Sequence, residues 1–149
     1  MTPETHFDQL RSRLRGAHVT DRLLAASSLS FSVSSSPAGD KAFSIWFDCP
    51  WRLTGPTGLL AGSVQAQDEE NDSGSIAVAR AVNVVVGQTI EDLKIDSKTG
   101  DLVISLSNNL EARTLASDAR DEMLWWIRDR SRGLDLSGSP AGLRVDAAA

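Results

Sequence analysis

An apolar residue recurs every three or four positions near the start of the chain, at Phe7, Leu10 and Leu14. This spacing places all three side chains on one face of a helix. Pro3 suits the first helical turn, and Gly16 suits the residue just after a helix, where a left-handed conformation is common. We therefore expect a surface helix with one buried face.

The apolar spacing changes to two from Val19 onward. In residues 29–33 apolar side chains alternate with serines, and residues 43–47 place three apolar side chains on one face. Such alternation is typical of a strand that is buried on one side only. Residues 19–64 are predicted to form an antiparallel meander of four or five short strands.

A polar, acidic stretch at 65–75 follows and is interpreted as a connector. The next segment, 76–86, is ambiguous, because its β-branched residues favour a strand. However, Ile76, Ala79, Val82 and Val86 also form a helical stripe.

A comparison of the two parts of the chain favours the helix. Leu14–Asp21 and Val85–Asp92 match in pattern, so that Gly16 aligns with Gly87 and Val19 with Ile90. Further matches pair 29–33 with 102–106, 43–47 with 110–115, and the strand at Trp51-Arg52 with 125–128. By this alignment 76–86 is a helix that ends at Gly87. Internal repetition of this kind bears directly on the fold.

The predicted fold class is α+β, with two pseudo-repeated helix-plus-antiparallel-strand units that form one domain. This domain is expected to cover residues 3–135, with halves at about 3–64 and 75–130. Residues 136–149 are rich in Ser, Gly, Pro and Ala, and are expected to be a flexible C-terminal tail.

Composition narrows the classes of partner. The 149 residues include 15 Lys and Arg against 20 Asp and Glu, giving a net charge of −5. This balance argues against nucleic acid, whose phosphates need clustered basic residues. We expect no membrane contact, since no apolar run approaches a bilayer-spanning length. The polar first 16 residues favour a cytoplasmic protein.

No residue set typical of catalysis or metal binding is evident. His6 and His18 are too far apart to share a helical metal site, and Cys49 is the only cysteine, with no histidine near it in sequence. The acidic run at 68–72 lacks the glycine and the final glutamate of a calcium loop. We therefore expect no cofactor and no metal, and lean against an enzyme.

The tryptophans are the most informative side chains. Trp46, Trp51, Trp125 and Trp126 form one pair in each half, all on predicted strands. Trp125 and Trp126 must point to opposite faces of their strand, so one of them is available for a homodimer seam, a ligand or a partner. Together with nearby arginines, the candidate binding residues are Trp51, Arg52, Trp126 and Arg128.

One set of short motifs resembles small uncharacterised bacterial proteins. The motifs are Phe43-x-Ile45-x-Phe47-x-Cys49-Pro50-Trp51-Arg52-Leu53, Gly62-Ser63, Gly87-x-x-Ile90 and Gly100-Asp101-Leu102-x-Ile104. The resemblance covers roughly residues 14–128 and implies no catalytic residue. By size and class the chain is also similar to the immunity proteins of toxin systems, and an acidic inhibitor would suit a basic toxin.

Two functions are therefore expected from the sequence. The first is a non-enzymatic, cytoplasmic binding or interaction protein of immunity-like type, which binds another protein or itself as a homo-oligomer. The alternative is a small-molecule-binding module or cryptic enzyme, in which the four Trp and Arg residues line a pocket between the halves and hold an anionic ligand.

Overall fold

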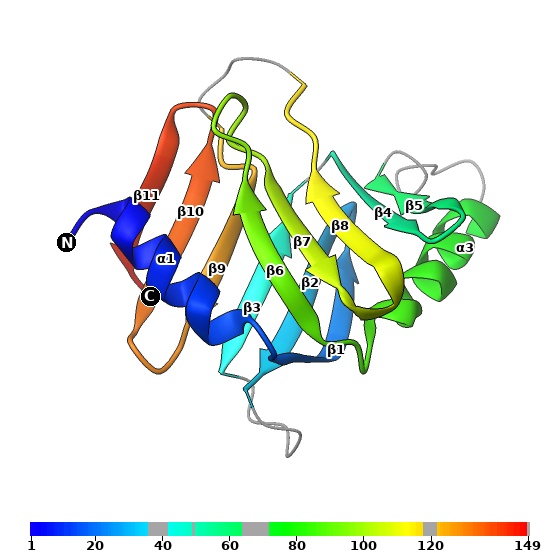
Figure 1. Cartoon of the computed structure of the whole chain (residues 1–149). Helices are drawn as coiled ribbons and strands as arrows, with labels where there is room; N and C mark the ends of the chain where they lie inside the picture. Colours follow the sequence, from blue (N-terminus) through cyan, green and yellow to red (C-terminus); the bar gives the residue numbers. More distant parts are fainter. Residues whose placement is uncertain (36–41, 49, 64–71, 118–121, 149) are drawn as a thin grey trace.

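The computed structural model describes residues 1–35, 42–48, 50–63, 72–117 and 122–148. The protein is mostly β, with 52% of residues in strands and 20% in helices, and its strands form two antiparallel sheets (Figure 1). The predicted α+β class with two helix-plus-strand units is therefore wrong. Each sheet takes strands from both parts of the chain, and the described helices are short covers at the sides of the sheets.

The bounds of the elements, in chain order, are as follows. They are α1 (Pro3–Leu14), β1 (His18–Ala25), β2 (Ser28–Ser34), β3 (Phe43–Phe47), β4 (Trp51–Gly55), β5 (Gly58–Gly62), α3 (Asp72–Val82), the 3₁₀ turn η1 (Asn83–Val85), β6 (Ile90–Ile95), β7 (Leu102–Leu106), the turn η2 (Ser107–Asn109), β8 (Leu110–Thr114), β9 (Trp125–Asp129), β10 (Leu134–Ser139) and β11 (Gly142–Ala147).

The chain changes sheet twice. The six-stranded sheet has the order β1-β2-β3-β9-β10-β11, and the five-stranded sheet has the order β5-β4-β8-β7-β6. After β3 the chain crosses to the five-stranded sheet, and after β8 it crosses back. The predicted meander at 19–64 is thus divided between the sheets, because alternation shows which side chains are buried but not which sheet holds a strand.

The ambiguous segment is helical, as the comparison of the two parts of the chain predicted. α3 is followed directly by η1, and the chain leaves this turn through Gly87 at φ 86°. Gly16 leaves α1 at φ 87°, in the same left-handed region that glycine adopts without strain. The predicted connector at 65–75 lies mostly outside the described residues, and α3 begins within it.

The two aligned segments bond to each other in matched pairs. The Gly16 N–H donates to the Ile90 carbonyl at 2.8 Å, and the Gly87 N–H donates to the Val19 carbonyl at 2.7 Å. A second pair of hydrogen bonds, at 2.8 and 2.9 Å, joins the same two segments. The starts of β1 and β6 are therefore held side by side by equivalent bonds.

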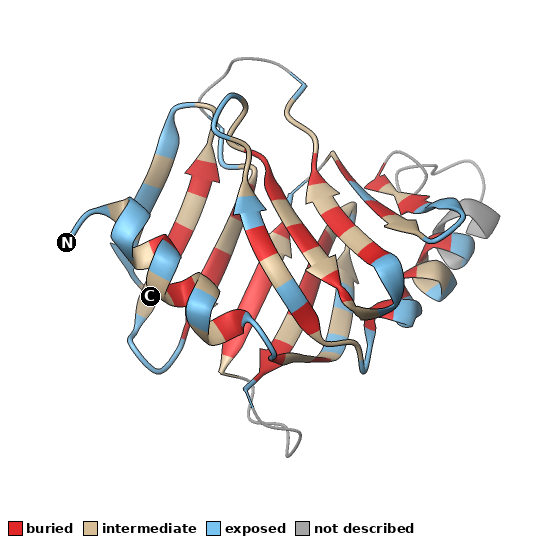
Figure 2. Ribbon diagram, in the orientation of Figure 1, coloured by how far each residue is buried: buried red, intermediate tan, exposed pale blue. Residues whose placement is uncertain are grey.

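The hydrophobic core lies between the two sheets. Figure 2 shows buried positions alternating with more exposed ones along most strands. Trp51 and Trp125 are the largest side chains of this core, and each indole N–H donates to a carbonyl in a hairpin turn. The acceptors are Ser27, at 2.6 Å, and Gly100, at 2.9 Å. Each buried tryptophan thereby fixes one hairpin without leaving its N–H unsatisfied.

The expected flexible tail is instead a pair of strands. β10 pairs with β9 and β11 along its length, and Leu136 is 4% exposed. One small residue of this segment has a packing role, because a Cβ at Gly138 would lie only 2.4 Å from the Trp125 ring. At this position a small residue allows close packing and does not indicate a flexible end.

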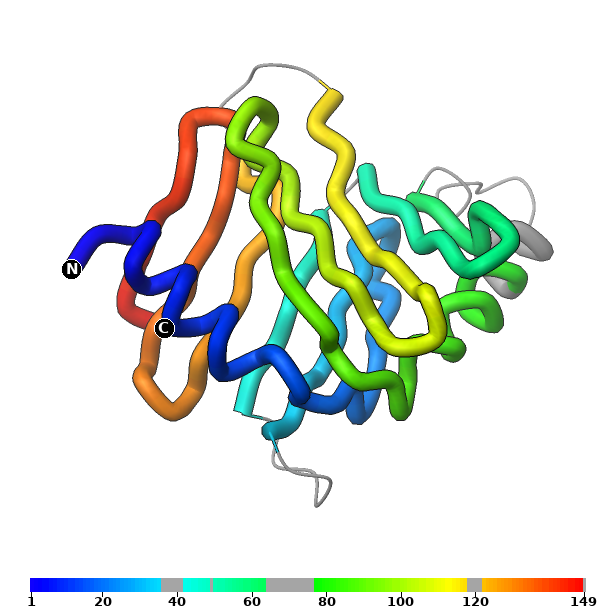
Figure 3. Tube along the Cα trace, viewed as in Figure 1, coloured from blue at the N-terminus to red at the C-terminus, as the bar shows by residue number. Residues whose placement is uncertain are grey.

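The helices cover the open sides of the two layers. α1 packs against β6, β10 and β11, whereas α3 packs against β5 (Figures 1 and 3). Figure 3 also shows both ends of the chain on the α1 side. The five-stranded sheet ends at β6, so β10 and β11 face α1 instead of a strand.

Candidate functional site

The four residues expected to line one pocket lie in three places. Trp51 is 1% exposed in the core, and Arg52 projects from the five-stranded sheet to solvent. Trp126 and Arg128 share the outer face of the six-stranded sheet. The structure thus brings Trp126 and Arg128 together, but not with Trp51 and Arg52.

Trp126 belongs to an aromatic and charged cluster on that outer face. It stacks on its cross-strand partner Trp46, with ring centroids 5.2 Å apart and an interplanar angle of 15°. The Arg128 guanidinium lies 5.3 Å from the Trp126 ring centre, and it donates two hydrogen bonds of 2.9 Å to Asp135. The bond to Asp135 also raises the pKa of Arg128. Trp46 was absent from the predicted site, although strand alternation places it on this face.

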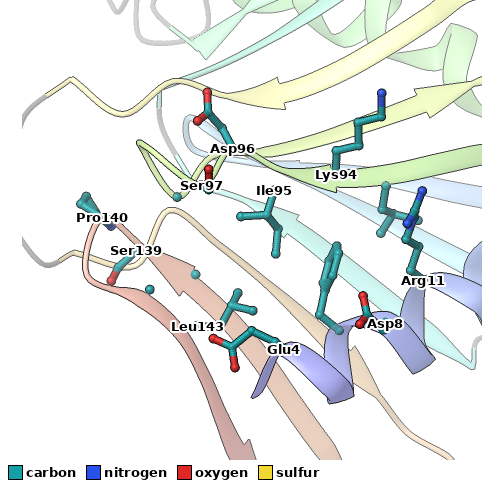
Figure 4. A pocket seen from close by; sticks show the side chains of 15 residues that line it. Glu4, Asp8, Arg11, Lys94, Ile95, Asp96, Ser97, Ser139, Pro140 and Leu143 are labelled. Carbon is teal, nitrogen blue, oxygen red and sulfur yellow. The ribbon is translucent and has the colours of Figure 1, made fainter. Parts of the chain in front are cut away.

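A cleft lies elsewhere, between α1, the edge strand β6 and the turn that joins β10 to β11. Its volume is about 540 Å³ (Figure 4). The apolar side chains that line it are Phe7, Leu93, Ile95, Pro140 and Leu143, and the polar ones are Glu4, Asp8, Arg11, Lys94, Asp96, Ser97 and Ser139. None of the four predicted binding residues is among them.

The cleft arises because the two sheets differ in width. In the described part of the chain the five-stranded sheet has no strand beyond β6, and α1 packs against β10 and β11. Phe7 of α1 is 8% exposed and packs against Trp125, with ring centroids 6.4 Å apart. Near the contact between Phe7 and Trp125, α1 fills the space between β6 and β10. Toward the end of β6 this space is open and forms the cleft.

A close backbone contact forms one end of the cleft. Gly100, in the β6–β7 turn, has φ 81°, and a Cβ there would lie 2.2 Å from the Ser139 carbonyl oxygen. Only glycine allows the two turns to approach so closely. Two hairpin turns from different sheets therefore meet at the end of the cleft.

The opposite end is marked by an ion pair. Arg11 donates two hydrogen bonds, of 2.7 and 2.9 Å, to the Asp92 carboxylate. These bonds are the main cause that lowers the pKa of Asp92 to about 2. They join α1 to β6, and the Asp92 carboxylate neutralises the positive charge of Arg11.

Two acidic side chains remain on the α1 side. Glu4 and Asp8 are exposed, and within the described residues neither forms an ion pair. Figure 4 shows both carboxylates on the helix at the cleft, whereas Lys94 extends away from them. The helix side of the cleft is therefore acidic.

The two histidines lie in different parts of the structure. His18 Nδ1 lies 3.3 Å from the Thr89 hydroxyl, and His6 lies by a minor cavity between α1 and β9–β11. Over the described ranges, no three His, Cys, Asp or Glu side chains are grouped in a way that could hold a metal. Cys49 and the acidic residues 68–70 lie outside the described residues.

No protein-family model, curated protein or solved structure matches the chain. A bilayer-crossing helix is also not found in the portion that the structure describes. The cleft and the outer face of the six-stranded sheet are the candidate sites of this protein.

Proposed function

We propose that this protein is a non-enzymatic binding protein and that its ligand site is the cleft between α1, β6 and the β10–β11 turn. The observation that carries the proposal is the cleft itself, which has an apolar lining and a charged rim. Its volume of about 540 Å³ falls within the range of roughly 300–1,000 Å³ that small-ligand sites occupy.

The chemistry of the lining favours binding over catalysis. The described residues around the cleft include neither histidine nor cysteine, and two of the three carboxylates, those of Glu4 and Asp8, are exposed to solvent. Apolar contact would supply affinity, and Glu4 and Asp8 would favour a ligand that carries positive charge. A cytoplasmic location is part of the proposal, in keeping with a chain that has a single cysteine.

Nuclear magnetic resonance can test this proposal with benzamidine, a small aromatic cation, as the probe. Backbone amide shifts should change at residues 93–97 and 138–143 as benzamidine is added. The Leu143→Trp variant, which fills the cleft, should lose these changes. Leu59→Trp, a matched substitution at an exposed position on β5, should keep them. Changes that are absent, or that cluster away from the cleft, would refute the proposal.

A second candidate function is self-association through the outer face of the six-stranded sheet. Trp46, Trp126 and Arg128 are only partly buried there, and interfaces are enriched in tryptophan and arginine. We propose a second copy of the chain as the occupant of this face. The immunity-like alternative, in which a different protein binds there, is the competing outcome.

Sedimentation of the purified protein separates these outcomes. A dimer that becomes a monomer in Trp126→Ser, but not in Arg52→Ser on the other sheet, would support self-association. A protein that stays monomeric up to about 100 µM, well above the dissociation constants of stable dimers, would rule out self-association. A different protein would then remain as the partner of this face.

A further inference from the structure

The edge of β6 offers main-chain hydrogen-bonding groups to the cleft. β6 is the last strand of the five-stranded sheet, and one side of its backbone has no strand beside it over the ranges that the structure describes. An exposed sheet edge is a template for another extended segment. A segment can add to β6 only where the N–H and C=O groups on this side have no other hydrogen-bond partner.

The first part of this edge is already occupied. The Ile90 N–H donates to the Ala17 carbonyl at 2.8 Å, and its carbonyl accepts the Gly16 N–H at the same distance. The α1–β1 connection therefore acts as a short neighbouring strand at the start of β6.

The middle of the edge is capped by a side chain. The Leu93 N–H donates to the Asp92 carboxylate at 2.9 Å, and Arg11 holds that carboxylate in place. Asp92 also marks a bulge, because the β6–β7 register shifts between Ile90 and Asp92. Bulges and charged caps are common ways in which proteins block an exposed edge.

The end of the edge, at Ile95, is open to the cleft. The β6–β7 hairpin closes with the Asp96 N–H donating to the Asp101 carbonyl at 2.9 Å. In an antiparallel ladder the direction of backbone groups alternates, so the N–H and C=O of Ile95 point away from β7. The capped Leu93 N–H, two residues earlier, confirms this alternation.

The surroundings of Ile95 suit an extended peptide. Figure 4 shows its side chain pointing from β6 toward Leu143, across the apolar part of the cleft. A residue paired with Ile95 on an added strand would turn its side chain to the same face. That side chain would enter the cleft and contact Leu143 and Phe7.

We infer that the cleft binds an extended peptide segment of another protein, which adds to β6 at the main chain of Ile95. The segment would place a bulky apolar side chain in the cleft and a neighbouring Lys or Arg beside Glu4 and Asp8. This inference rests on the proposed function and specifies its ligand.

The test uses a phage-displayed library of random heptapeptides, selected on the full-length protein. We expect enriched peptides that combine an apolar residue with Lys or Arg. Leu143→Trp should abolish binding of the enriched peptide, and Leu59→Trp should not. In a Glu4→Gln, Asp8→Asn double variant, peptides should still be enriched but without the preference for Lys or Arg.

Main-chain pairing is tested separately. Ile95→Pro removes one N–H and should weaken the enriched peptide about tenfold, the effect of one lost hydrogen bond. Leu24→Pro on the edge strand β1 is the matched control. Leu24 lies two residues after Arg22, whose N–H is capped by Asp21, just as Ile95 lies two residues after Leu93, whose N–H is capped by Asp92. N-methylation of the peptide residue that pairs with Ile95 gives the same test without altering the protein.

The outcomes separate the inference from the proposed function. If benzamidine binds the cleft but no peptide is enriched, the peptide inference fails and the proposed function stands. If peptides are enriched but bind Leu143→Trp and Ile95→Pro as well as the wild type, the inference also fails. If neither benzamidine nor peptide binds the cleft, both are wrong.

Discussion

The edges of β1 and β6 have the same backbone arrangement but different surroundings. Each strand follows a left-handed glycine, and each has a bulge near its start. In each, the aspartate at the bulge accepts the N–H of the next residue, from Arg22 at 2.8 Å and from Leu93 at 2.9 Å. The two edges therefore differ in side chains and in neighbouring strands rather than in backbone.

Those differences decide which edge carries a cleft. Asp92 is bound by Arg11 of α1, which lies five residues before Gly16. The residue five positions before Gly87 is Val82 of α3, which cannot form an ion pair. On the β1 side, Arg22 instead reaches the Asn83 side chain at 2.7 Å. Among the described residues no strand lies outside β5, whereas β11 lies outside β10 and supplies Leu143 to the cleft. The cleft therefore lies beside β6, where α1 supplies Arg11 and β11 supplies Leu143.

The largest expected loss of stability comes from replacing a glycine on β10, and a glycine on β5 is the comparison. Gly138→Ala should destabilise the protein by about 3 kcal/mol, because its Cβ would lie 2.4 Å from the buried Trp125 ring. Gly62→Ala should cost less than about 1 kcal/mol, since its Cβ would meet only the Trp51 carbonyl, at 3.5 Å. Urea unfolding of both variants measures the difference, and equal costs would contradict the packing described for Trp125.

The next effect concerns how α1 is attached. Burial opposes ionisation of Asp129, but hydrogen bonds from Arg13 and Ser131 hold its pKa below the usual value. Asp129→Asn should cost about 2 kcal/mol in urea unfolding, typical of a hydrogen bond to a charged group. Asp146→Asn, at an exposed ion pair on β11, should cost less than about 0.5 kcal/mol. A similar loss in both variants would mean that α1 does not depend on this contact.

A smaller effect distinguishes the outer faces of the two sheets. Trp46 and Trp126 pair across β3 and β9, whereas Arg52 and Arg113 are direct cross-strand partners on β4 and β8. Stacked aromatic pairs stabilise a sheet and facing like charges do not. Trp46→Ala should therefore cost about 1 kcal/mol in thermal or urea unfolding, and Arg113→Ala should cost nothing or stabilise slightly. The reverse order would refute this reading of the two faces.

The smallest effect is a pH dependence at the β6 edge. The pKa of Asp92 is about 2, below its ordinary value of 3.8, so its ion pair stabilises the fold fully above pH 4. This contribution is lost as the pH falls through 2. The stability difference between wild type and Arg11→Met should therefore be smaller at pH 2 than at pH 6. A difference that does not change with pH would show that the pair contributes no ionic stabilisation.

Local patterns in the sequence predicted the elements well. Alternation identified 29–33 and 102–106, which are β2 and β7, and the alignment of Gly16 with Gly87 identified the helix before β6. Alternation also placed Trp125 and Trp126 on opposite faces. These features depend on neighbours within a few residues, which the sequence shows directly.

Features that depend on distant contacts could not be predicted. The pairing of β3 with β9 joins residues about 80 positions apart, and alternation contains no information about that choice. The composition of 136–149 suggested a flexible tail, because the contact of Gly138 with Trp125 exists only in the folded chain. The cleft was missed for the same reason, because Ile95 on β6 and Leu143 on β11 line one cleft only once the two sheets have packed together.

Amide hydrogen exchange at Ile95 tests the cleft as a peptide site most directly. In the free protein the Ile95 amide should exchange faster than that of Lys94, which faces β7 in the alternating ladder. Adding the enriched peptide should slow exchange at Ile95 by at least about tenfold, while the Leu24 amide on β1 stays unchanged. Unaltered exchange at Ile95 in the presence of bound peptide would contradict strand addition at this edge.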